Sequence, residues 1–202
     1  MKKTSAQFWE WFKEHHHDYL QLDQVDEDAQ EDLLDAMQDA LHGYCDELFF
    51  DIGLPKEGVH EFIVTAEGET KYFHHVEKLI AEAPSIAPWK FIAFVPPIGT
   101  DFTFDYEGIK LLPKNMWFLP LENPKDKDSI GIKICCKEFL DLRSNKAFLP
   151  SIYTIVDMIV GEKIYATEID HIEAGSLPDD PEMAGMLPLA DLMDYIEDFR
   201  MN

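Results

Sequence analysis

The 202-residue sequence is poor in basic residues and contains no long apolar run. Its 17 lysines and arginines are outnumbered by 40 aspartates and glutamates, which gives a formal net charge of −23. A surface with this balance repels phosphate backbones, so we expect no nucleic-acid partner. No apolar stretch approaches the ~20 residues that a membrane-spanning helix needs, so we expect no membrane partner either.

Cysteine is also scarce: the chain has only Cys45, Cys135 and Cys136. An odd number with two adjacent members does not make a disulfide framework, which indicates a reducing compartment. The N-terminus lacks the apolar segment and the cleavage site of a signal peptide, so we expect a cytoplasmic protein. Cys136 is expected in the core, whereas Cys135, between Lys133 and Lys137, is a candidate low-pKa thiol.

Sequence motifs that carry chemistry are largely missing. The chain has no glycine-rich phosphate loop, no nucleophile elbow and no zinc-binding H-E-x-x-H helix. A calcium-loop pattern starts at Asp126, but Ile130 and Lys137 occupy positions that require oxygen ligands. The sequence therefore predicts no metal, no cofactor and no catalytic residue, and an enzyme is the less favoured class.

The clearest pattern that is present runs from Gly58 to Pro97. His60–Ala66 is rich in Phe, Ile and Val and predicts a strand, and the apolar face of Tyr72–Ala83 predicts a helix. Trp89–Val95 is apolar on both alternating faces, which is typical of a strand in the middle of a sheet. We therefore predict that the Trp89 indole is buried against the preceding helix.

The rest of the chain alternates in the same way between helical and extended patterns. Further helices are predicted at Ser5–Leu20, Asp26–Cys45, Phe148–Val160 and Leu189–Phe199, and further strands at Glu47–Ile52, Phe102–Glu107, Ile109–Leu112, Met116–Leu121, Ser129–Lys137 and Glu162–Ala174. We predict one α+β domain over residues 1–202, with two N-terminal helices, a central sheet and C-terminal helices. Its sheet is expected to be single, mixed and largely antiparallel, with the helices packed on it.

The helix predicted at Asp26–Cys45 carries acidic residues opposite its apolar stripe. They are Asp26, Glu27, Asp28, Glu31, Asp32, Asp35 and Asp39. Acidic residues in the first turn are stabilised by the helix dipole, but those further along gain nothing from it and repel one another. Glu31, Asp32, Asp35 and Asp39 are therefore candidate binding residues for a cationic partner, although an ordinary solvated face explains them as well.

A second polar group lies in the predicted strand Glu162–Ala174. Glu168 and Asp170 share one face of this strand and His171 points to the other, while Glu162 stands at its start. Paired carboxylates can serve as general acid and base. A metal-dependent or carboxylate-based hydrolase that uses these four residues is therefore the alternative function, although an exposed sheet face explains the same pattern.

Three segments, residues 81–97, 159–178 and 187–199, resemble motifs of an uncharacterised bacterial family of unknown-function domains. The matching positions are Trp89, Pro96, Pro97, Gly161 and Glu162. The resemblance implies a single-domain cytoplasmic α+β protein, and some similar domains are assigned as immunity proteins against secreted toxins. It implies no catalytic residues. With the net charge, it favours a non-enzymatic acidic binding protein, immunity-like, that engages a basic protein partner.

Overall fold

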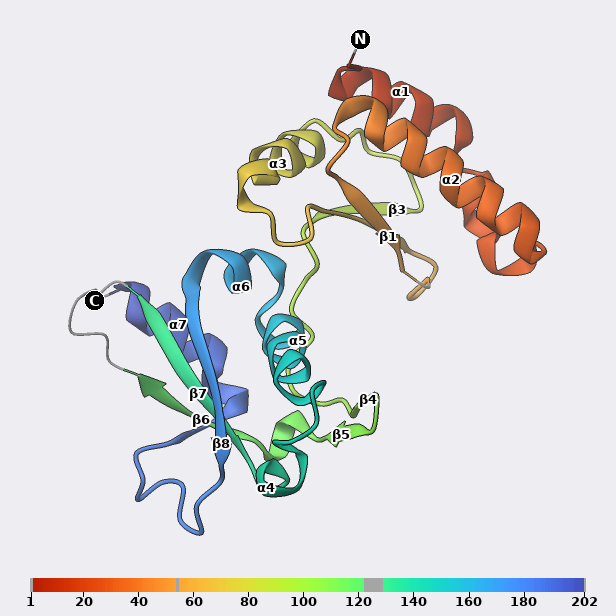
Figure 1. The fold of residues 1–202 in the computed structure, drawn as a ribbon. Coiled ribbons are helices and arrows are strands. Elements are labelled where there is room, and N and C mark those ends of the chain that lie inside the picture. The colour runs from red at the N-terminus through yellow and green to blue at the C-terminus, as the bar shows by residue number, and fades with distance from the viewer. Residues whose placement is uncertain (1, 54, 122–128, 202) are drawn as a thin grey trace. The chain divides into compact units, whose positions relative to one another are not determined.

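The computed structural model describes residues 2–53, 55–121 and 129–201 (Figure 1). The architecture is α+β, and the chain divides into two compact units, residues 1–95 and 96–202. The expected single sheet is wrong, because the described strands form three separate sheets. The single domain stays a prediction, since compactness does not measure whether the two units unfold together.

The first unit builds a three-stranded sheet from two hairpin strands and a crossover. Its elements are α1 (Ser5–His15), the 3-10 helix η1 (Asp18–Gln24), α2 (Glu27–Tyr44), β1 (Phe49–Ile52), β2 (His60–Thr65), η2 (Thr70–Tyr72), α3 (Phe73–Ala81) and β3 (Trp89–Ala93). β1 pairs antiparallel with β2, and β2 pairs parallel with β3. Figure 1 shows α1, α2 and α3 along one side of this sheet.

Aromatic side chains fill the core between α1 and this sheet. The ring of Phe12 lies 5.2 Å from that of Phe62 on β2 and 5.3 Å from that of Phe91 on β3, measured between centroids. The indole Nε1 of Trp9 donates a hydrogen bond to the Leu79 carbonyl of α3 at 2.8 Å. Such rings supply much of the buried area of a small core, so they hold α1 against the strands and α3.

The central position predicted for the strand at Trp89 is wrong. The sheet order β1-β2-β3 places β2 in the middle and β3 at an edge of the described sheet. The strand ends at Ala93, because Phe94 has a φ of 67° and turns its ring onto Phe73, with centroids 4.5 Å apart. Trp89 is buried as predicted, at 8% exposure, and its ring packs on Phe12 of α1 with centroids 5.4 Å apart.

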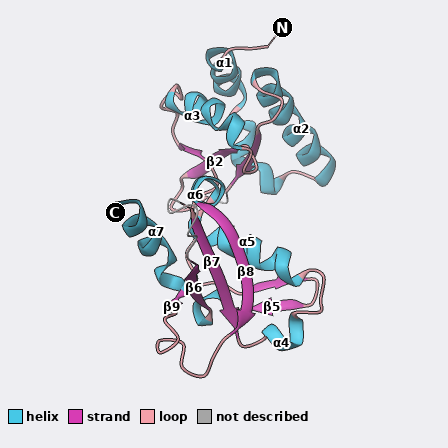
Figure 2. Ribbon diagram, turned by 60° about the vertical axis from the view of Figure 1, so that its left-hand side comes forward, coloured by secondary structure: helices cyan, strands magenta, loops and turns pink. Residues whose placement is uncertain are grey.

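The second unit contains a two-stranded hairpin and a four-stranded sheet. Its elements are β4 (Phe104–Tyr106), β5 (Ile109–Leu111), η3 (Pro113–Asn115), β6 (Trp117–Leu121), β7 (Ile130–Cys136), α4 (Phe139–Leu142), α5 (Phe148–Val160), α6 (Glu162–Glu168), β8 (Ile169–Ser176), β9 (Leu187–Pro188), η4 (Leu189–Asp191) and α7 (Leu192–Met201). The larger sheet has the order β8-β7-β6-β9 (Figure 2). β7 pairs parallel with β8 and antiparallel with β6.

The core of the second unit lies between this sheet and two helices. Alternate residues of β7, including Ile132 and Ile134, are buried together with Ile152 and Ile155 of α5 and Ile196 of α7. α5 spans the residues that the sequence predicts. Because this helix is apolar nearly all round, it can be buried on several sides.

The segment Glu162–Ala174, predicted as one strand, contains a helix and a strand. Gly161 has φ 79° and ψ 155°, a conformation that glycine adopts without steric penalty, and it separates α5 from α6. α6 covers Glu162–Glu168, and β8 starts only at Ile169. Glu168 and Asp170 therefore do not share a strand face, which removes the geometric basis of that predicted pair.

Candidate functional site

The acidic residues of α2 point away from the protein core. The opposite side of the helix, with Met37, Ala40 and Leu41, is buried and fixes the rotation of α2. The exposed carboxylates are those of Asp26, Glu27, Asp28, Glu31, Asp32, Asp35 and Asp39. Asp26 is the N-cap, since its Oδ1 accepts a hydrogen bond from the Ala29 amide at 2.9 Å. Glu27 and Asp28 lie in the first turn, where the helix dipole favours negative charge, whereas the other four carboxylates lie beyond it.

We call Glu31, Asp32, Asp35 and Asp39 the α2 acidic face. Within residues 2–53, 55–121 and 129–201, none of these four side chains forms an ion pair with a lysine, arginine or histidine. Glu31 and Asp35, and Asp35 and Asp39, stand four residues apart and repel each other by ~0.2–0.5 kcal/mol per pair. A cation that binds this face would relieve that repulsion.

Glu168, from the second predicted group, is part of an ion pair between two helices. Its Oε1 accepts a hydrogen bond from the guanidinium of Arg200 on α7 and another from the Thr167 hydroxyl at 2.9 Å. The hydrogen bond from Arg200 is the main cause that holds the pKa of Glu168 below its usual value. The carboxylate is therefore ionised and already paired.

Asp170 occupies an irregularity in the pairing of β7 with β8. The register passes from Ile130 opposite Ile169 to Gly131 opposite His171, so Asp170 is the extra residue of a β-bulge. Its Oδ2 accepts a hydrogen bond from the Ile130 amide at 3.0 Å. The carboxylate thus satisfies a backbone donor, which is a structural role.

The other two members of the group also lie apart. His171 Nε2 is 3.3 Å from Oε1 of Glu173 on the same strand. Glu162 is buried on α6, at 5% exposure. Burial, followed by the charge of Glu162, raises the pKa of Asp157 on α5. Glu162 and His171 therefore belong to different elements, α6 and β8.

A pocket of about 220 Å³ touches part of this group. Asp170 and His171 line it together with Tyr153 and Tyr165. The two glutamates of the group do not line it. The four residues therefore do not converge on one concavity, which a hydrolase site of these residues requires.

Within the part of the chain that the structure describes, no three His, Cys, Asp or Glu side chains are grouped so that they could hold a metal ion. The calcium-loop pattern that starts at Asp126 falls largely outside the described residues. The described residues also include no helix whose length and apolar character would allow it to cross a membrane.

The reactive thiol suggested by the sequence is wrong. Cys135 is fully buried, and burial raises the pKa of its thiol despite the opposing charge of Lys133. Burial likewise raises the pKa of Cys136 to about 12, in agreement with its predicted place in the core. A buried thiol with a raised pKa is inert as a nucleophile.

A larger pocket lies at one end of the four-stranded sheet, where β7 and β8 end. Trp117 and Lys137 line it, although the sequence does not suggest a site at either residue. Sequence patterns identify each strand, but they do not show that β7 and β8 are parallel neighbours whose ends meet.

The chain was compared with family models, with curated proteins and with solved structures, and none of them matches. The resemblance to unknown-function domains therefore remains an expectation.

Proposed function

We propose that this chain is a non-enzymatic binding protein of the cytoplasm, immunity-like, that engages a basic protein partner through the α2 acidic face. The observation that carries the proposal is the exposure of the six carboxylates of α2 and of its N-cap Asp26, with the α2 acidic face unpaired in the described residues. The net charge of −23 supports it, because a strongly acidic surface accelerates the encounter with a basic partner.

The rigidity of the face also supports binding. α2 has a capped start, an apolar side that packs on the unit core and 18 residues in one helix. A helix fixed in this way presents its carboxylates at constant spacing, so a partner does not have to order them. An exposed loop with the same charges would lose more conformational entropy on binding.

The hydrolase alternative receives less support. Glu168 is paired with Arg200, Asp170 satisfies a backbone amide, and the group does not share one pocket. No contact in the described residues favours it over the binding function.

Affinity capture from the native host tests the proposal. One variant replaces the four residues of the α2 acidic face by the corresponding amide residues, glutamine for Glu31 and asparagine for the three aspartates. Its matched control replaces Glu182, Asp191, Asp194 and Glu197, four exposed acidic residues of the second unit, in the same way. Both variants change the net charge by the same amount, so only the location of the charge differs.

We expect the parent and the control variant to capture the same basic protein at low ionic strength, with capture falling as salt rises. The α2 variant should lose it. Equal loss in both variants would show that only total charge matters, and a partner that is neutral or acidic, or no partner, would overturn the proposal.

A further inference from the structure

The larger pocket of the second unit has a volume of about 690 Å³ and lies where three strands reach the same end of the sheet. Cys136 ends β7 and Ser176 ends the parallel strand β8, while Trp117 begins the antiparallel strand β6 opposite Cys135. Chain segments that leave parallel neighbours at their carboxyl ends diverge and form a crevice, a common place for ligands. The volume suits a small molecule.

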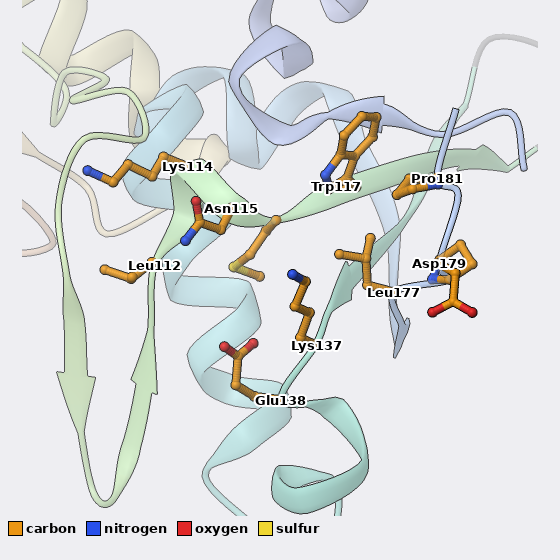
Figure 3. Close-up of a pocket in the computed structure, with 11 residues that line it drawn as sticks. Leu112, Lys114, Asn115, Trp117, Lys137, Glu138, Leu177, Asp179 and Pro181 are labelled. Atoms are coloured by element: carbon orange, nitrogen blue, oxygen red, sulfur yellow. The ribbon is translucent and has the colours of Figure 1, made fainter. Parts of the chain in front are cut away.

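The ammonium group of Lys137 is available to a ligand there. Figure 3 shows its side chain directed toward the middle of the pocket, beside Leu177 and on the side of the Trp117 indole, while the Asp179 carboxylate points away from it. Among the described residues, Lys137 forms no ion pair or side-chain hydrogen bond. Lys114, the second lysine of the lining, points away from Lys137 and pairs with Asp101 at 3.2 Å.

Trp117 provides the second donor and a flat apolar wall. Its indole is half-buried, and its Nε1 has no hydrogen-bond partner in the parts of the chain that the structure describes. Indole Nε1 and a lysine ammonium can only donate hydrogen bonds, so the ligand has to supply acceptors. Met116 and Leu177 add apolar surface to the lining.

The other charges of the pocket limit the charge of the ligand. Glu138 and Asp179 also line it, and both are carboxylates. A doubly charged anion would meet their repulsion with only one unpaired cation to offset it. A single carboxylate is neutralised by one ammonium and can also accept from an indole N–H.

We infer that this pocket binds a small monocarboxylate with a flat apolar body, such as an aromatic acid. The carboxylate is held by Lys137 and the indole Nε1 of Trp117, and the apolar body lies against Trp117 and Leu177. This site lies in the second unit and is independent of the α2 acidic face of the first.

Two-dimensional ¹H–¹⁵N NMR of the full chain tests the inference with 2-naphthoate as the probe. The neutral alcohol 2-naphthylmethanol has the same rings and tests the role of the carboxylate, and 2-naphthyl phosphate tests the charge limit. Lys137→Met removes the cation that points into the pocket. Lys114→Met is the matched control, since it removes a lining lysine that is already paired.

We expect 2-naphthoate to produce saturable shifts of the Trp117 indole N–H signal in the parent and in Lys114→Met. The affinity should fall by about tenfold or more in Lys137→Met and for the alcohol, because one charge-assisted hydrogen bond is lost. The spectra themselves show whether each variant is folded. Absence of saturable shifts, equal affinity for the alcohol, tighter binding of the phosphate, or equal loss in both lysine variants would each overturn the inference.

Discussion

Trp89 connects α1 with the strands of the first unit through a single side chain. Its ring lies 5.4 Å from that of Phe12 and 5.3 Å from that of His60, measured between centroids. Its indole Nε1 donates a hydrogen bond to Nδ1 of His16 at 3.2 Å. Both the apolar body and the polar atom of this side chain are therefore used in the fold.

Replacing Trp89 by alanine should destabilise the protein by about 3–5 kcal/mol, the usual range for a buried aromatic side chain. The substitution leaves a cavity beside Phe12 and removes the hydrogen bond to His16. Urea unfolding of Trp89→Ala and of the parent measures the difference. A loss of less than about 1 kcal/mol, as is typical of surface positions, would show that the indole is not part of the core.

His16 makes the stability of the first unit depend on pH. Burial is the main cause that lowers the pKa of its imidazole below 6.5, the neighbouring His17 adds to the effect, and Asp18 opposes it. The neutral ring also accepts the hydrogen bond from Trp89, and protonation of Nδ1 would remove that acceptor. Proton binding therefore favours the unfolded chain, in which the pKa is higher.

We expect this contribution to be complete above the unfolded pKa of 6.5 and to be lost as the pH falls toward the folded pKa. The test is the urea midpoint of the parent and of His16→Gln between about pH 7 and pH 5. Glutamine does not titrate, so the parent should lose more stability over this interval. Parallel profiles for the two proteins would contradict the assignment.

At the scale of elements, local sequence patterns predict most helices and strands. They do not predict which strands are neighbours or which strand lies at the edge of a sheet. α5 matches its predicted limits because an apolar run ends at Gly161. α6 was missed because Ile164, Tyr165 and Thr167 are residues that also suit a strand. The pattern at Trp89–Ala93 reports burial, and burial occurs at the edge of a sheet as well as in its centre.

The candidate sites also differ in how far local patterns predict them. Helical periodicity predicts that the carboxylates of α2 lie on one side, and all of them are exposed. The pocket at Trp117 and Lys137 depends on strand pairing over long sequence separations, which local patterns do not contain. The grouping of Glu168 with Asp170 failed because one residue ends α6 and the other lies in a bulge of β8.

The α2 acidic face should reduce the stability of its own helix. Asp35→Lys replaces two repulsive pairs, with Glu31 and Asp39, by two attractive ones, so the free energy of unfolding should rise by about 0.8–2 kcal/mol at low salt. Asp35→Asn, which only removes the repulsion, should give roughly half of this gain. Urea unfolding at low and at high salt measures both. No gain at low salt, or a gain that salt does not reduce, would contradict the electrostatic description of this face.

The stability of the bulge at Asp170 should depend on the hydrogen-bond acceptor of this side chain and not on its charge. Asp170→Ala leaves the Ile130 amide without this acceptor and should cost about 1 kcal/mol, while Asp170→Asn keeps an oxygen in place and should cost less. Chemical denaturation of the two variants measures the difference. Equal losses would show that the hydrogen bond to Ile130 contributes little to the fold.

At the scale of the whole molecule, charge is the property that most constrains function. The chain has 40 acidic and only 17 basic residues. This balance disfavours the binding of anionic macromolecules and favours the binding of cationic ones. Several described lysines are already engaged with carboxylates, among them Lys2 with Asp46 and Lys90 with Glu61. A basic partner would therefore meet a surface with few competing cations.

Zero-length carbodiimide cross-linking in host lysate tests the proposed function most directly, because it joins only carboxylates and amines that are in contact. Mass spectrometry of the joined peptides then locates the cross-linked residues on both proteins. We expect Glu31, Asp32, Asp35 and Asp39 to be joined to lysines of one basic protein, with fewer cross-links at high salt. Cross-links confined to carboxylates outside α2 would contradict the proposal that this face is the binding surface.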